Sequence, residues 1–186
     1  EGSVLPESYD FERGEPRAAV LARMQTAMAR TVKALWAKRR VGSCPVVTPA
    51  QAVTLAAIVE KETAKAAERP IVAGVYCNRL RIGMKLDADP TVIYPITKGK
   101  PLGRRILKSE LDAITGYNTY REPGLPAGPI TNPGRASIAA VLNPAQTDYL
   151  YFVADGTGGH AFARTLAEQE ANKAKWFAIR HARGEM

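Results

Sequence analysis

The chain has 186 residues, 46% of them hydrophobic and 24% charged, which is enough for one sizeable folded core. No run of about 18 apolar residues is present, so composition excludes a transmembrane helix within this sequence. The formal net charge is +8 at pH 7, but no nucleic-acid-binding signature accompanies it, and we exclude nucleic acid as a partner.

The first half of the chain predicts three helices, over 16–40, 48–67 and 70–82. Apolar residues recur at helical spacing in each range. Thr48 followed by Pro49 is a strong helix start, a capping hydroxyl before a first-turn proline. The second helix is apolar on more than one face, so we expect it at the centre of the fold.

Two stretches are basic and contain no acidic residue. Residues 17–40 hold seven lysines and arginines, and residues 98–108 hold five. Such clusters attract anionic lipid surfaces or acidic polymers. A solvated helix face explains them equally well.

The stretch 55–63 carries a carboxyl group directly after five apolar residues, at Glu60. Burial raises a carboxyl pKa, and a carboxyl that keeps its proton near neutral pH can act as a general acid. We therefore predict that Glu60 is a general acid, although a Glu here also marks where a helix turns toward water. Glu62 continues the stripe from Leu55 through Ile58, so periodicity alone does not decide which Glu is catalytic.

The second half of the chain alternates short elements with rigid turns. Asp89-Pro90 favours extended backbone, and Thr91–Tyr94 has strand composition. A glycine-rich turn at 155–159 lacks the Lys-Ser/Thr of a phosphate loop, so we reject that interpretation. The predicted elements are a short helix or turn over 109–114, a helix over 135–142, a hairpin from strands at 149–153 and 160–162, and a final helix capped by Thr165 and ending near 184.

Polar and aromatic side chains near these turns suit carbohydrate, since sugars offer apolar faces to aromatics and hydroxyls to amides. A structural hydrogen bond is an equally good role for each. The candidates for holding a sugar are Asn78, Asp89, Thr91, Tyr94, Tyr117, Asn118 and Tyr120. We assign Glu62 to support, through an ion pair with Arg79 or another polar contact.

Cysteines and histidines give no metal-site pattern. Cys44 and Cys77 are far apart; they could pair, but their spacing does not demand it, and Cys77 fits a small buried residue. His160 and His181 are isolated, so we expect no metal and no cofactor. The elements together predict an α+β fold: a single domain over 1–186, with a helical core, a small antiparallel sheet, and a small subdomain at about 84–130.

Seven motifs in one order resemble the endolytic murein transglycosylases, the MltG or YceG-like family. They are Val59-Glu60-Lys61-Glu62-Thr63, Asn78-Arg79-Leu80, Asp89-Pro90-Thr91-Val92-Ile93-Tyr94, Tyr117-Asn118-Thr119-Tyr120, Gly124-Leu125-Pro126, Asn132-Pro133-Gly134 and Tyr151-Phe152-Val153.

The resemblance implies a periplasmic enzyme tethered to the inner membrane, working beside the cell-wall synthesis and division machinery. Such an enzyme cuts nascent peptidoglycan strands internally between MurNAc and GlcNAc and leaves 1,6-anhydroMurNAc ends. It uses a single catalytic Glu, which maps onto Glu60. The family's N-terminal transmembrane helix and LysM-like domain are not in this sequence. Because it opens at Glu1 without Met, we expect it to be a processed or trimmed part of a longer protein.

The sequence departs from the family pattern at Asp87-Ala88, Pro95 and Ala127. An extra carboxylate at Asp87 leaves open a muramidase-like hydrolase, with Glu60 and either Asp87 or Asp89 activating a water molecule. A third hypothesis for the function is a non-catalytic glycan-binding domain. No lysine lies in a context that favours a Schiff base, which argues against a pyridoxal-phosphate lyase.

Overall fold

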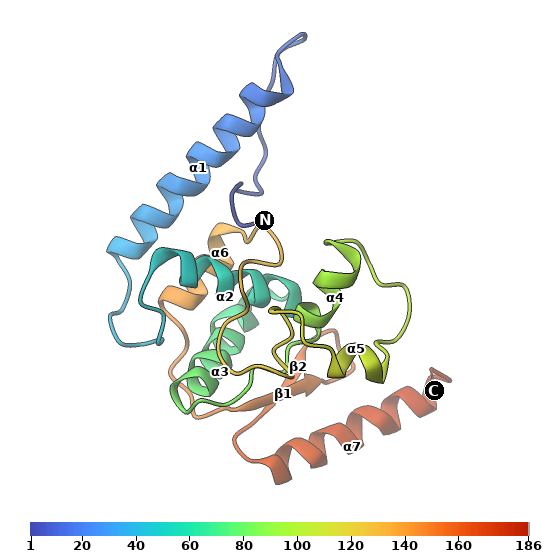
Figure 1. The fold of residues 1–186 in the computed structure, drawn as a ribbon. Helices are drawn as coiled ribbons and strands as arrows, with labels where there is room; N and C mark the ends of the chain where they lie inside the picture. Colours follow the sequence, from blue (N-terminus) through green and yellow to red (C-terminus); the bar gives the residue numbers. More distant parts are fainter. Residues whose placement is uncertain (186) are drawn as a thin grey trace.

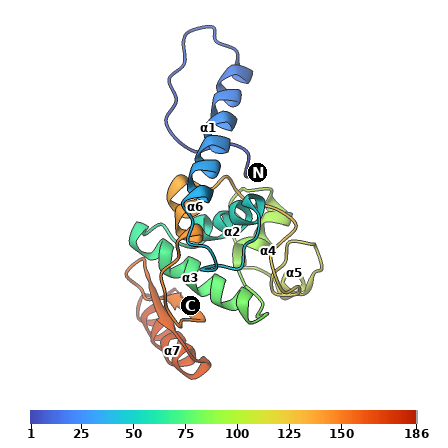
Figure 2. The same cartoon turned by 90° about the vertical axis from the view of Figure 1, so that its left-hand side faces the viewer.

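Helices make up about half of the computed structural model, which describes residues 1–185 (Figure 1). In chain order the elements are α1 (Arg17–Ala37), α2 (Pro49–Glu62), the short 3-10 helix η1 (Ala66–Glu68), α3 (Arg69–Arg81), α4 (Asp89–Thr97), α5 (Lys108–Asp112), α6 (Arg135–Leu142), β1 (Tyr151–Ala154), β2 (His160–Ala163) and α7 (Leu166–Ala182). The first and last helices lie at opposite ends of the molecule in both views (Figures 1 and 2). The predicted α+β class is confirmed.

Helix α2 is the centre of the core, as its sequence predicts. Every residue from Ala52 to Val59 is buried, and the helix packs against α3 and α6. Its start is also as predicted, because the Thr48 hydroxyl accepts a hydrogen bond from the Gln51 amide at 3.2 Å. Its end is not, because the helix stops at Glu62 and not near residue 67. Thr63 turns into extended backbone, and its hydroxyl accepts from the Lys65 amide at 3.1 Å.

The predicted strand at Thr91–Tyr94 is wrong, because these residues belong to helix α4. Pro90 sits in the first turn, where its fixed φ favours a helix start. The Thr91 hydroxyl donates to the Ala88 carbonyl at 2.7 Å and lies 2.9 Å from the Thr119 hydroxyl. These tertiary contacts outweigh a β propensity that depends on packing context.

The predicted hairpin is confirmed. Strands β1 and β2 pair antiparallel, with Tyr151 opposite Ala163 and Ala154 opposite His160. Helix α7 packs against both strands. The predicted cap of this helix is also present, as Thr165 and Glu168 form a reciprocal capping box.

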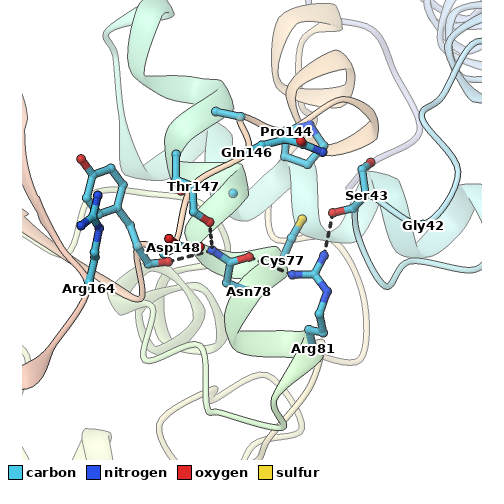
Figure 3. Close-up of a pocket in the computed structure, with 13 residues that line it drawn as sticks. Gly42, Ser43, Cys77, Asn78, Arg81, Pro144, Gln146, Thr147, Asp148 and Arg164 are labelled. Carbon is cyan, nitrogen blue, oxygen red and sulfur yellow. Dashed lines mark hydrogen bonds between the residues drawn. The ribbon is translucent and has the colours of Figure 1, made fainter.

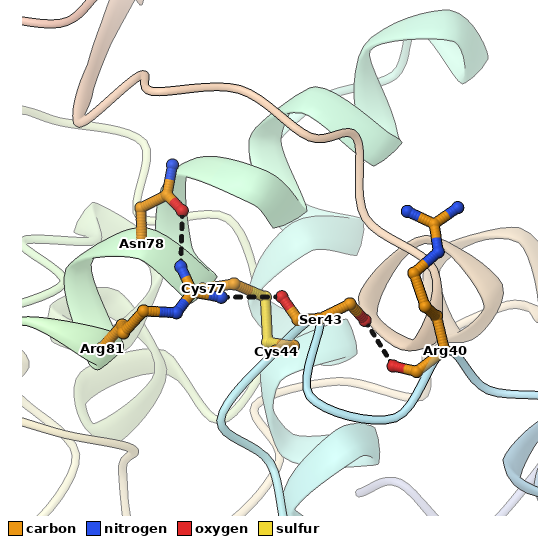
Figure 4. Close-up of a disulfide and its surroundings, with 6 residues drawn as sticks. All are labelled: Arg40, Ser43, Cys44, Cys77, Asn78 and Arg81. Carbon is orange, nitrogen blue, oxygen red and sulfur yellow. Dashed lines mark hydrogen bonds between the residues drawn. A yellow bond between two sulfur atoms is a disulfide. The ribbon is translucent and has the colours of Figure 1, made fainter.

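A disulfide joins Cys44, in the α1–α2 connector, to Cys77 in α3 (Figure 4). Cys77 is buried as expected, but it is bonded and not a free core residue. The Arg81 guanidinium reinforces this junction by donating to the Ser43 carbonyl at 2.9 Å. Within residues 1–185, no helix is both long and apolar enough to cross a membrane.

Candidate active site

Glu62 ends helix α2, and its half-buried carboxyl group accepts a hydrogen bond from the Tyr76 hydroxyl at 2.7 Å. Burial is the main influence on this carboxyl and raises its pKa to about 7, with a further rise from the charge of Asp89. The Tyr76 hydrogen bond and the charge of Arg79 oppose the rise. Glu62 therefore keeps a proton on a large fraction of molecules near neutral pH.

Tyr76 lies on α3 and is 1% exposed, so its hydroxyl is held in place. The Phe152 ring from β1 packs edge-on against the Tyr76 ring, with centroids 5.8 Å apart. Burial, together with the neighbouring Glu62, raises the Tyr76 pKa well above its ordinary value. The phenol therefore stays protonated and acts as a fixed donor to Glu62.

A second carboxyl group faces this pair from the start of α4. The Tyr120 hydroxyl donates to Asp89 Oδ1 at 2.6 Å. Burial and this hydrogen bond both raise the Tyr120 pKa, so the phenol remains a donor. The site thus combines a carboxyl that can hold a proton with a carboxylate, each bonded to a tyrosine.

Tyr94, in α4, and Tyr117 form an aromatic pair. Their ring centroids are 5.1 Å apart, and both side chains are half-buried. The Lys98 ammonium lies 5.6 Å from the Tyr94 ring centroid, where the two groups attract. Aromatic faces with an adjacent cation can contact a sugar that carries an acidic substituent.

Thr91 and Asn118, two predicted sugar ligands, have structural surroundings. Both are buried, at 0% and 1% exposure. The Asn118 amide donates to the carbonyls of Leu111 and Ala113 at 2.9 and 2.8 Å, and holds the end of α5. Their polar groups are occupied within the protein and do not reach the Glu62 site as free ligands.

Asn78 lies away from Glu62, in a separate cavity of about 600 Å³ (Figure 3). Its amide donates to the carbonyls of Thr147 and Tyr149 at 2.7 and 3.0 Å, and its oxygen accepts from Arg81. The side chain therefore ties α3 to the segment before β1. The structure does not bring Asn78 together with the other predicted sugar ligands.

Arg79 is buried, but the predicted ion pair with Glu62 is not formed in the described chain. The guanidinium donates to the Leu150 and Leu86 carbonyls at 2.6 and 2.8 Å, and lies 3.5 Å from Asp87. It is near enough for its charge to lower the Glu62 pKa. The other alternative for Glu62, a second polar contact, is present as the bond to Tyr76.

The Glu60 side chain, from α2, contacts the start of α6, so its surroundings differ from those of Glu62. Its Oε2 atom accepts from the Gly134 amide at 3.0 Å and from the Ser137 hydroxyl at 2.6 Å. A carboxylate in this place accepts from one backbone amide and one hydroxyl at a helix N-terminus, where negative charge stabilises the helix. The arrangement links α6 to α2 and leaves Glu62 as the carboxyl beside Asp89.

The sequence signal for Glu62 was its position on the buried stripe of Leu55 and Ile58. Tyr76, which sequence reasoning missed, is a polar aromatic residue within the apolar run of α3. Its hydroxyl needs a partner when the helix is buried. That need is the signal that could have singled it out.

Comparisons with known proteins identify relatives of this chain. The profile of the YceG-like family matches residues 1–175. The chain is 34% identical over 185 residues to an endolytic murein transglycosylase of Bacillus subtilis, and 31% identical over 181 residues to one of Streptococcus pneumoniae. These alignments cover 97% and 94% of this chain but 49% and 32% of the two relatives, so the chain spans half of their length or less.

A solved structure is also similar. A YceG-like protein of Listeria monocytogenes matches with a TM-score of 0.75 and 31% sequence identity. The match covers 91% of this chain and 53% of that protein's chain. Fold and sequence therefore give the same relationship.

Proposed function

This chain belongs to the YceG-like family, and from that premise we propose that it is the catalytic domain of an endolytic peptidoglycan lytic transglycosylase. The relatives named endolytic murein transglycosylase support this activity. The observation that carries it is the half-buried Glu62 carboxyl, bonded to Tyr76, with a pKa of about 7. Glu62 takes the role that the sequence assigned to Glu60.

The proposed reaction needs one carboxyl group in two roles. Protonated Glu62 donates to the glycosidic oxygen between MurNAc C1 and GlcNAc, and the bond breaks as positive charge develops at C1. The Glu62 carboxylate then takes the proton from the C6 hydroxyl of the same MurNAc, whose oxygen bonds to C1. The product is a 1,6-anhydro ring, Glu62 is protonated again, and no water is consumed. A nucleophile within the same sugar can lower the barrier by about 7–11 kcal/mol.

The neighbouring groups support these steps by electrostatics and position. Tyr76 orients the Glu62 carboxyl, and the Asp89 carboxylate lies where it can stabilise positive charge on the sugar ring. Tyr94 and Tyr117 offer faces for further sugars along the strand. Lys98 suits the carboxylates of stem peptides.

The disulfide supports an extracytoplasmic location, since such bonds persist in oxidising compartments. We place the domain on the periplasmic face of the inner membrane, held there by a segment outside this sequence. Its proposed substrate is the nascent glycan strand beside the synthesis machinery.

The products of peptidoglycan digestion test the proposal directly. We expect purified sacculi treated with this chain to release internal fragments with anhydroMurNAc ends, detected by mass spectrometry. Reducing MurNAc ends would instead indicate a hydrolase, with Asp89 as the second carboxylate. Binding to strands without any cleavage would indicate a glycan-binding domain.

The pH profile gives a second prediction. Because Glu62 must be protonated to start the reaction, we expect kcat to fall as pH rises through about 7. Tyr76→Phe removes a hydrogen bond that lowers the Glu62 pKa, so this alkaline limb should move to higher pH. A group with a pKa of about 7 titrates between roughly pH 6 and 9. A profile that is flat over this range, or an alkaline limb that Tyr76→Phe leaves in place, would therefore contradict the assignment of Glu62 as the acid.

The same raised pKa has a consequence for stability. The pKa of Glu62 in the folded protein, about 7, lies above its ordinary value of 4.5. The stabilising effect of the protonated Glu62 is therefore fully present below the unfolded pKa and is lost as pH rises through about 7. Denaturation at several pH values should show this loss in the wild type, and the loss should be smaller in Glu62→Gln.

A further inference from the structure

The Glu62–Tyr76 pair is part of a ring of side-chain contacts that closes through the peptide bond between Glu62 and Thr63. Two members of this ring, Glu68 and His160, have no role in the proposed reaction. Glu68 ends η1, and His160 begins β2, 92 positions later in the chain. Both side chains are largely buried, at 13% and 15% exposure. The hairpin that carries His160 was singled out in the sequence only for its glycines.

One side of the ring holds the backbone next to Glu62. The Glu68 carboxylate accepts from the Thr63 hydroxyl at 3.0 Å and from the His160 amide at 3.0 Å, and it lies 2.8 Å from His160 Nδ1. Although burial opposes it, these hydrogen bonds lower the Glu68 pKa overall, so it remains an ionised acceptor. Thr63 directly follows Glu62 and ends α2. The Glu68–His160 pair thereby fixes the point at which α2 stops.

The other side of the ring holds the Tyr76 hydroxyl. The His160 ring packs edge-on against Phe152, with centroids 5.2 Å apart at 86°. Phe152 packs in the same way against Tyr76, whose hydroxyl donates to Glu62. The donor and the acceptor of the Glu62 hydrogen bond are therefore both held by His160, one through Phe152 and the other through Glu68.

Gly159 allows this close approach. A Cβ atom at this position would overlap the Glu68 carboxylate and the Lys65 ammonium. A larger residue here would push the Glu68 carboxylate away from its present position, where it accepts from the His160 amide. The glycine of the turn thus has a specific steric role at this junction.

We propose that Glu68 and His160 are positioning residues for the reacting carboxyl, keeping Glu62 and Tyr76 at hydrogen-bonding distance by fixing Thr63 on one side and Phe152 on the other. The inference rests on the proposed function for its catalytic readout. In this proposal Glu62 is still the residue that donates the proton.

The test compares His160→Ala, Glu68→Ala and His160→Asn with the wild type. We expect the two alanine variants to lower kcat roughly ten- to a hundredfold, with KM little changed, since small displacements of a catalytic group have effects of this size. Asn places an amide N–H near the position of Nδ1 and so can restore the contact with Glu68, but it has no ring to pack against Phe152. His160→Asn should therefore recover part of the loss. Met28→Ala, in the buried part of α1, is the control for lost stability alone.

A purely structural role for the pair predicts a different pattern. His160→Ala and Met28→Ala, compared at temperatures equally far below their unfolding midpoints, would then have equal kcat, and His160→Asn would not differ from His160→Ala. Either result would overturn the proposal.

A readout that needs no cleavage separates this proposal from the proposed function. The Glu62 carboxyl can be titrated by carbon-13 NMR in the folded protein, where Tyr76, Asp89, Arg79 and Tyr120 are the groups that face it. Because His160→Ala loosens the Tyr76 bond, which lowers the Glu62 pKa, we expect that pKa to rise in the variant. An unchanged pKa would refute the positioning role, whereas absence of anhydro products with a shifted pKa would refute only the proposed reaction.

Discussion

Replacing Glu62 by Gln is expected to reduce the formation of anhydroMurNAc ends by about 10²- to 10⁴-fold, the usual contribution of a general acid. The amide keeps the shape of the side chain and can still accept from the Tyr76 hydroxyl, but it cannot deliver a proton. The measurement is the rate of anhydro-end release from purified peptidoglycan, followed by mass spectrometry. Thermal unfolding of the same variant is the control, and we expect its midpoint to show an intact fold.

Glu60→Gln is the matched control, because it makes the same chemical change two residues away. Glu60 bonds to Gly134 and Ser137 at the start of α6. Weakening these charge-assisted bonds should cost about 1–2 kcal/mol of unfolding free energy. We expect activity to stay within a few-fold of the wild type. Loss of activity in Glu60→Gln, with Glu62→Gln still active, would return the catalytic role to Glu60.

The choice between these two residues shows where sequence reasoning ended. Helical periodicity placed Glu62 on the buried stripe with Leu55 and Ile58, yet it could not show what each carboxyl would meet. The partner of Glu62 comes from α3 and the partners of Glu60 come from α6, more than 70 residues further on. The different partners of the two carboxyl groups arise from the packing of three helices, which periodicity along one helix cannot predict.

The local patterns that succeeded are those whose cause is also local. Thr48-Pro49 and the Thr165–Glu168 capping box define helix starts within four residues, and both are present. The predicted strand at 91–94 failed because its β propensity was overridden by contacts with Thr119, 28 positions away. Composition suggested Asn118 as a sugar ligand, but it could not show that the Asn118 amide donates to three carbonyls at the end of α5.

Removing the disulfide has the largest expected effect on stability. Cys44 and Cys77 are 33 positions apart, and a cross-link closing a loop of this size stabilises a protein by about 3–4 kcal/mol through the entropy of the unfolded chain. The variant in which both cysteines become Ala should therefore lose about 3 kcal/mol of unfolding free energy in chemical denaturation. Alanine suits both sites, since each is buried and a serine hydroxyl would need a partner.

Reduction of the wild type provides the internal control for this prediction. A reducing agent should lower the wild-type stability to nearly that of the double-alanine variant and leave the variant itself unchanged. Equal stability of the wild type with and without the reducing agent, once full reduction is verified by thiol counting, would contradict the expected contribution.

The bond also bears on the site, because Cys77 directly follows Tyr76, the residue that holds the Glu62 carboxyl. If the tether helps to place α3 against α2, reduction should lower kcat as well as stability. The domain would then be most active in the oxidising compartment where its proposed substrate is made.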